Sequence, residues 1–191
     1  MAIFTCATLL AAVDATAQRR ATNEELAALP RWCHATRGFS ELPGPGNSFK
    51  DYMARYGPGW SHVHHYCWAL TSIMRYDRFG NSRQAKAGYA MSALGDIRYV
   101  LNRVEPDFVL WADIVNKKTR LLIRERELDQ AMASAREMLA AYPERADSYG
   151  LMAEVLFEVG RRGDARKILE EGETKVKDPE RLEKIRSVMK L

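Results

Sequence analysis

The 191-residue sequence has few cysteines and no long apolar run, and each shortage excludes a class of protein. The three cysteines include no Cys-x-x-Cys pair, which excludes the common zinc-finger pattern and covalent c-type haem attachment. No apolar stretch is long enough to cross a bilayer, so we expect no membrane span. The sequence also lacks a serine nucleophile elbow, a phosphate-binding loop and a paired-carboxylate arrangement. We therefore expect a protein that is not an enzyme.

The charge is also modest, at a formal +4 with a pI near 9.0. Acidic and basic residues alternate, as in Arg124–Glu127, which is typical of solvated helix faces and not of a phosphate-binding stripe. We therefore expect no nucleic-acid partner. The hydrophobic content of 47%, with ordinary numbers of proline and glycine, indicates one globular domain with a real core.

The first residues have the pattern of an export signal. An apolar stretch, Ile3 to Val13, is followed by the small residues Ala15 and Ala17, so residues 1–17 are a possible signal peptide. No basic residue precedes the apolar stretch, and the alternative is an N-terminal helix packed on the domain. Export of the bacterial type, to the periplasm or outside the cell, would remove Cys6 and leave an even pair of cysteines in an oxidising compartment.

Residues 18–59 predict an irregular segment with short helices. Asn23 is a candidate cap of the first short helix, and Pro30 interrupts it. The stretch from Gly38 to Asn47 is too rich in glycine and proline for regular structure, and a second short helix is expected from Phe49 to Tyr56.

Residues 60–191 are predicted to be helical throughout. Apolar residues recur at helical spacing in the segments that follow Ser61, Ser82 and Phe108, and no stretch alternates as a strand would. Ser61 is a candidate cap of the first of these helices. Breaks at Pro106, Pro143 and Pro179 recur about every 36 residues, the mark of a helical solenoid. The sequence therefore predicts an all-α fold.

Residues 149–179 resemble a tetratricopeptide repeat (TPR). The large and small residues of its two helices and the glycine of its turn stand at Tyr149, Met152, Ala153, Leu156, Gly160, Ala165, Leu169 and Gly172. Residues 112–143 match more loosely, and residues 60–106 match only in outline. The resemblance implies a solenoid of about three helix pairs, with the segment from Pro179 to Leu191 as a capping helix whose charged side faces water.

The resemblance also implies a concave surface, formed by the first helix of each pair, that holds a protein or peptide. The partner could be another copy of the chain. The inward positions are Asp113, Asn116, Lys117, Arg120, Arg124, Asp147, Glu154 and Glu158. Among them, Asn116, Arg120 and Arg124 form a basic and polar strip suited to an acidic or carboxylate-bearing segment. Alternatively, these are solvated polar positions of amphipathic helices.

A second cluster of chemically active residues lies between Trp32 and Trp68, and three interpretations stay open. A disulfide between Cys33 and Cys67 would link the irregular segment to the first helix pair and raise the free energy of unfolding by roughly 3–4 kcal/mol. A metal site for zinc or copper, or axial ligation of haem, would draw on Cys33, His34, His62, His64, His65 and Cys67. In the third interpretation the histidines and free cysteines are structural. A Cys/His nucleophile is disfavoured because Cys67 falls on an apolar helix stripe.

Overall fold

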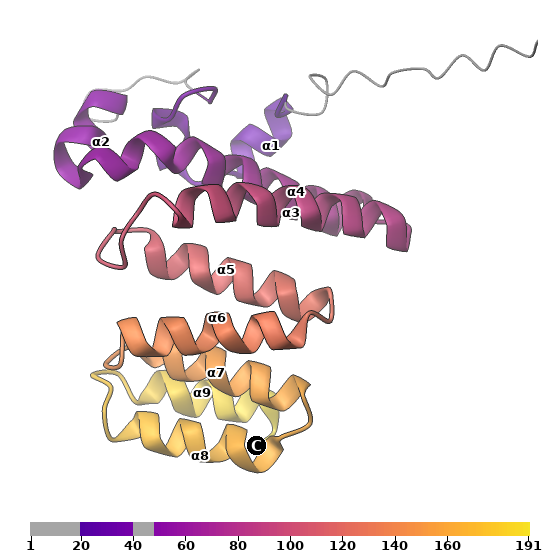
Figure 1. Cartoon of the computed structure of the whole chain (residues 1–191), viewed down its shortest axis with the longest axis vertical. Coiled ribbons are helices and arrows are strands. Elements are labelled where there is room, and N and C mark those ends of the chain that lie inside the picture. Colours follow the sequence, from indigo (N-terminus) through magenta and orange to yellow (C-terminus); the bar gives the residue numbers. More distant parts are fainter. Residues whose placement is uncertain (1–19, 40–47) are drawn as a thin grey trace, which may run out of the picture.

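The described part of the chain is helical. The structure, a computed structural model, describes residues 20–39 and 48–191, and every regular element in these ranges is a helix. This confirms the all-α fold. The possible signal peptide, residues 1–17, and most of the predicted loop from Gly38 to Asn47 lie outside the described residues. Figure 1 shows the helices stacked along the long axis, from α1 and α2 at one end to α8 and α9 at the other.

Three helix pairs and a last single helix make up the stack. Their bounds are α3 (Val63–Phe79) and α4 (Arg83–Leu101), α5 (Trp111–Arg124) and α6 (Leu128–Ala141), α7 (Ala146–Glu158) and α8 (Arg162–Glu173), then α9 (Glu180–Met189). The two helices of each pair pack on each other, and each second helix packs on the first helix of the next pair. In addition, α5 packs on α7 and α7 on α9. This is the predicted TPR-like solenoid of about three pairs with a C-terminal capping helix.

Small side chains allow the helices of the last two pairs to approach closely. Ala131, Ala153 and Ala165 are fully buried between helices. A Cβ atom at Gly172 of α8 would lie 2.6 Å from the ring carbon Cγ of Tyr149 and 2.8 Å from Leu182 Cδ1. Such distances are far below van der Waals contact, so only glycine lets α8 sit against Tyr149 and α9.

The turns inside these two pairs have the same backbone geometry. Arg126 lies in the α5–α6 turn with a φ of 63°, and Gly160 lies in the α7–α8 turn with a φ of 81°. In each turn the next amide donates back to a carbonyl five residues earlier, at 2.9 and 2.8 Å. This is the Schellman closure of a helix, repeated about 34 residues later, as in a TPR array. The same turn is therefore made by glycine in one repeat and by arginine in the other.

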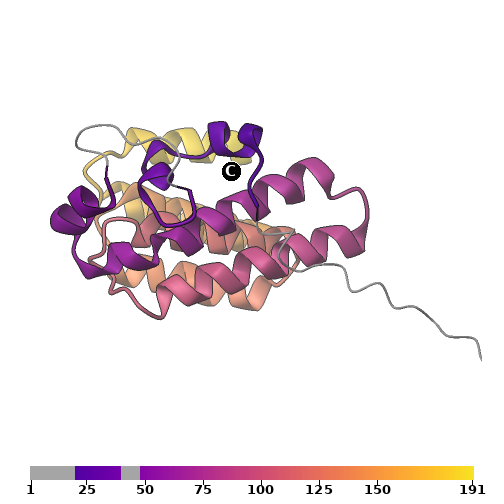
Figure 2. The ribbon, with the colours of Figure 1, turned by 90° about the horizontal axis from the view of Figure 1, so that it is seen from above.

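The N-terminal segment consists of short elements at the other end of the stack (Figures 1 and 2). They are α1 (Asn23–Ala28), the 3₁₀ helix η2 (Arg31–Ala35), α2 (Phe49–Tyr56) and the 3₁₀ helix η3 (Pro58–His62). Two predicted caps are wrong. The first helix is capped by Thr22, whose side chain and amide form a reciprocal box with Glu25. Ser61 lies inside η3 and donates its hydroxyl hydrogen to the carbonyl of Pro58 at 2.7 Å, so α3 starts without a side-chain cap.

A covalent bond and a largely buried ion pair are among the links that join this segment to α3. Cys33 of η2 and Cys67 of α3 form a disulfide with an S–S distance of 2.10 Å, and both residues are fully buried. The guanidinium of Arg75 donates two hydrogen bonds to the carboxylate of Glu25, at 2.6 and 2.8 Å. Glu25 is buried, but the hydrogen bonds from Arg75 outweigh the burial and hold its pKa below the usual value.

An aromatic cluster fills the space around the disulfide. Trp32 stacks on Tyr66 at 5.8 Å and meets Trp60 edge-on at 6.1 Å. Trp60 is in turn stacked on Tyr52 at 4.4 Å and on Tyr56 at 5.4 Å. Rings from η2, α2, η3 and α3 thus form one apolar unit, which short helices could not make by themselves.

Candidate functional site: a groove along the first helices of the repeats

A groove of about 710 Å³ runs along α5, α7 and α9. These are the helices that occupy the first-helix positions of successive repeats. The lining residues are Asn116 and Arg120 of α5, then Asp147, Gly150, Leu151, Glu154, Phe157 and Glu158 of α7, then Arg181, Lys184, Ile185, Val188 and Met189 of α9, with Lys190 after it. The structure therefore brings five of the predicted concave residues together, namely Asn116, Arg120, Asp147, Glu154 and Glu158.

The wall of the groove on the α9 side is apolar. Val188 is 76% exposed, the largest exposed fraction among the large apolar residues of the described chain. Ile185 and Met189 lie half-buried beside it, and Phe157 of α7 faces the same space. An apolar surface of this kind, edged by charged side chains, is the usual character of a protein-binding groove.

Ion pairs occupy the charged side chains along the rim. Arg120 pairs with Glu154 at 3.1 Å, and Arg181 pairs with Asp147 at 2.6 Å. Burial raises the pKa of Glu154, although the guanidinium of Arg120 opposes this shift. Most charges at the rim are therefore already neutralised by a neighbour, and Lys184 and Lys190 are the cations of the groove for which the described residues provide no carboxylate partner.

Of the predicted basic strip, Asn116 and Arg120 line the groove and Arg124 does not. Its guanidinium pairs with Asp77 and lies 4.1 Å from the ring centroid of Tyr76, on the side of the first helix pair. Asp113 accepts a 2.6 Å hydrogen bond from the buried hydroxyl of Tyr66, and Lys117 is exposed outside the groove. The resemblance implies that these residues share the concave surface with Asn116, but Arg124 and Asp113 contact α3 of the neighbouring pair instead.

The groove residues of α9 are not among the predicted concave positions. The last helix is predicted to be a cap whose charged side faces water, but α9 packs on α7 as α7 packs on α5. The signal was present in the proline spacing. Pro179 stands where a further repeat would begin, so the helix after it takes a first-helix position and turns one face to the groove.

The histidines lie apart from the groove, near the disulfide. His65 is hydrogen-bonded to Asp96 at 2.6 Å and stacks on Tyr99 at 3.7 Å. Nδ1 of His64 lies 3.0 Å from the carbonyl of Ser61, while burial lowers the pKa of both His64 and His62. His64 and His65 of α3 and His62 of η3 therefore each contact other groups of the protein.

The structure pairs the two cysteines of the proposed metal site with each other. In residues 20–39 and 48–191, no three histidine, cysteine or acidic side chains are grouped so that they could hold a metal ion. Cys33 and Cys67 use their sulfur atoms in the disulfide, and His34 is half-buried in η2. The described helices also include none that is long and apolar enough to span a membrane.

Comparison with known proteins gives one match. Residues 122–187, from the end of α5 into α9, match the family model of the tetratricopeptide repeat. No curated protein and no solved structure matches the chain. The C-terminal half of this chain is therefore a TPR-like repeat. Repeats of this family serve as scaffolds for protein–protein interaction and are typically non-catalytic. A groove lined by first helices is consistent with such a scaffold.

Proposed function

We propose that this protein binds a segment of another protein in the groove along α5, α7 and α9. The observation that carries the proposal is the apolar wall formed by Phe157, Ile185 and Val188 on first-helix positions of a TPR-like array. Apolar side chains of the segment would cover this wall, and Asn116 on the opposite side would hydrogen-bond to its backbone. The protein acts as a binding scaffold and not as an enzyme.

The charge distribution favours an amphipathic segment over a purely acidic one. Arg120 is already paired with Glu154, and Arg181 with Asp147, so neither is free to neutralise a row of acidic residues without breaking a contact. Lys184 and Lys190, in contrast, are available at the α9 edge. A segment with an apolar face and one or two carboxylates beside it fits this arrangement best.

The experiment uses a photo-crosslinking amino acid in place of Val188. A matched position is Val109, which is apolar and 53% exposed but lies outside the groove. We expect a discrete partner to crosslink at position 188 and not at position 109. Binding of that partner should weaken by about tenfold in Val188→Glu, the loss expected when an apolar contact is replaced by a buried charge.

Three results of this experiment decide between candidates. A crosslinked product made of two copies of the chain identifies self-assembly as the use of the groove. A different protein, lost in Val188→Glu, identifies an adaptor. Equal crosslinking at both positions, or none at position 188, contradicts the proposal that the groove is the binding site.

We also propose that the protein is exported and that residues 1–17 are its signal. The pairing of Cys33 and Cys67 supports this, because disulfides persist in oxidising compartments and are rare elsewhere. Intact mass spectrometry of the natively expressed protein tests it. A mass lacking residues 1–17, with no alkylation before reduction, is the expected result, and a full-length mass with reactive thiols contradicts it.

A further inference from the structure

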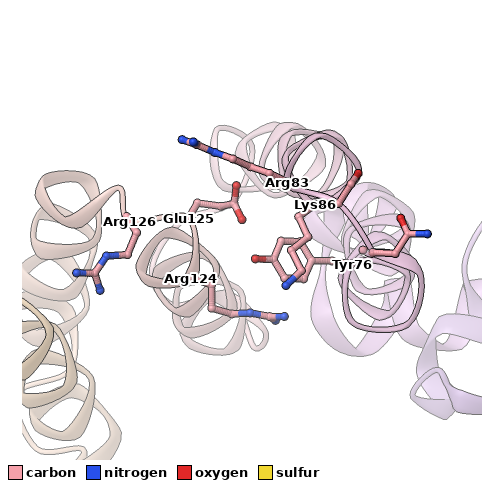
Figure 3. A pocket seen from close by; sticks show the side chains of 9 residues that line it. Tyr76, Arg83, Lys86, Arg124, Glu125 and Arg126 are labelled. Carbon is pink, nitrogen blue, oxygen red and sulfur yellow. The ribbon is translucent and has the colours of Figure 1, made fainter.

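A second cavity, of about 500 Å³, lies between the α3–α4 turn and the α5–α6 turn (Figure 3). It shares no lining residue with the groove along α5, α7 and α9. The lining residues are Tyr76, Gly80, Asn81, Ser82, Arg83, Lys86, Arg124, Glu125 and Arg126. Four of these side chains are cationic and one is anionic, so the cavity has a strong excess of positive charge.

Only part of this charge is neutralised by the protein. Arg124 pairs with Asp77, and Arg126 pairs with Glu158 at 3.0 Å. Neither Arg83 nor Lys86 has a carboxylate partner in the described part of the chain. A concave surface with an excess of one sign of charge focuses the electrostatic potential and attracts counter-ions.

Lys86 is held in the cavity by packing. A Cβ atom at Gly80 would lie 2.6 Å from Lys86 Cγ, so the aliphatic part of the lysine rests directly on the glycine backbone. Its ammonium nitrogen lies 5.5 Å from the ring centroid of Tyr76, and Arg124 approaches the same ring at 4.1 Å. Figure 3 shows both side chains reaching toward Tyr76 from different helices. Both cations therefore lie against the same ring.

Glu125, the acidic residue of the cavity, accepts a hydrogen bond from the same tyrosine. Burial, together with a hydrogen bond from the hydroxyl of Tyr76 to Glu125, raises the pKa of Tyr76. Glu125 therefore faces a hydroxyl donor. The first turn of α4 also opens here, with the Ser82 side chain accepting from the Ala85 amide and the amides of Arg83 and the next residue left without helical partners.

We propose that this cavity binds a phosphate group. Lys86 would supply a charge-assisted hydrogen bond, and Arg83 would supply a second one after its guanidinium turns in from the outward position that Figure 3 shows. The first-turn amides of α4 would supply neutral donors, and the combination suits a doubly charged tetrahedral oxyanion. The side-chain cluster carries the assignment, and the helix start adds to it. The phosphate is either a free ion or part of a modified side chain, because both present the same three oxygens.

The test is a titration of the full chain followed by NMR of the backbone amides, at constant ionic strength with chloride as the background ion. Inorganic phosphate and O-phosphoserine are the two probes. We expect saturable shifts confined to the α3–α4 turn and the α5–α6 turn. Lys86→Gln should weaken binding by about tenfold, as expected for the loss of one charge-assisted hydrogen bond.

The matched control is Arg98→Gln, which removes an equal charge from the exposed surface of α4 outside the cavity. Its affinity should equal that of the unmodified protein. Tighter binding of O-phosphoserine assigns the cavity to a modified chain, and tighter binding of inorganic phosphate assigns it to the free ion. Absence of saturable shifts, or equal weakening in Arg98→Gln and Lys86→Gln, overturns the proposal, and neither result bears on the groove.

Discussion

The two ends of the molecule are held together by different means. At the N-terminal end, short helices are fixed by individual side chains, including the Cys33–Cys67 disulfide and the Glu25–Arg75 ion pair. At the C-terminal end, α6 to α9 are joined by repeated close packing around small residues such as Ala135 and Gly172. No disulfide joins the described helices of this second end.

The difference follows from element length. A helix of six or eight residues buries too little apolar surface to offset the entropy of ordering it, so specific links must supply the remainder. Helices of ten to fourteen residues, stacked on neighbours of the same kind, share their stabilisation with the next repeat. The N-terminal end should therefore be sensitive to the chemistry of a few groups, and the repeat end to changes of shape.

The largest effect is expected from removal of the disulfide. Replacing both Cys33 and Cys67 by alanine should lower the free energy of unfolding by about 3–4 kcal/mol, because the unfolded chain regains the entropy of a loop closed over 34 residues. Urea unfolding, followed by the tryptophan signal of the N-terminal cluster, measures the change. Addition of reductant should destabilise the unmodified protein and leave the double variant unaffected. An identical response of both proteins would show that the disulfide does not contribute.

The Glu25–Arg75 ion pair should give the N-terminal end a dependence on pH. The pKa of Glu25 is lowered from 4.5 in the folded protein, so its stabilisation is complete above that value and is lost as the pH falls through the lower folded pKa. Glu25→Gln should cost about 2 kcal/mol at neutral pH and progressively less in acid. Unfolding midpoints measured from about pH 7 to about pH 3 test this.

The control for the pH series is Glu24→Gln, since Glu24 is 69% exposed and its pair with Arg78 is screened by solvent. Its stability should follow that of the unmodified protein at every pH. A constant difference between Glu25→Gln and the unmodified protein across the series would contradict the assignment.

At the repeat end, a single added methyl group should be destabilising. Gly172→Ala places a carbon against the ring of Tyr149 and should cost about 1–2 kcal/mol, even though alanine favours helix. Gly150→Ala is the matched variant, because its new carbon is too close only to the terminal methyl group of Ile185, which can rotate away. Thermal unfolding should show a loss for Gly172→Ala alone. Equal losses would mean that shape at α8 is not decisive.

The smallest expected effect concerns the turn that the two repeats share. Arg126 adopts the left-handed conformation that Gly160 adopts in the next repeat, and this conformation disfavours a side chain. Arg126→Gly should stabilise the chain by about 0.5 kcal/mol or less, since relief of strain is offset by loss of the exposed pair with Glu158. Glu158→Gln, which removes only the pair, separates the two contributions. Destabilisation by Arg126→Gly greater than that of Glu158→Gln would contradict the strain.

The fold could be predicted from the sequence because its determinants are local. Helical spacing of apolar residues, the proline breaks, and small residues such as Ala153 and Gly172 are all visible along the chain. The candidate groove could be predicted in part. Asn116, Arg120 and Glu154 follow from the repeat pattern, whereas Arg124 is withdrawn by the neighbouring helix pair, which no pattern within α5 reveals.

The remaining features depend on contacts between distant segments. The apolar wall on α9 follows only when the last helix is placed in a first-helix position beside α7. The proposed phosphate cavity joins residues from two turns, and Lys86 and Arg124 approach the ring of Tyr76 from different helices. The reciprocal cap of Thr22 and Glu25 was one residue from the predicted one, because Asn23 and Thr22 are both acceptable caps by composition.

The ion pair between Arg126 and Glu158 connects the two candidate sites. Arg126 lines the phosphate cavity, and Glu158 lines the groove. A ligand that draws Arg126 away leaves a carboxylate uncompensated at the groove and changes the segment that the groove prefers. By thermodynamic linkage, a segment that engages Glu158 changes the affinity of the cavity by the same factor. If both sites bind as proposed, this pair couples them only weakly, because a solvent-exposed salt bridge contributes little free energy.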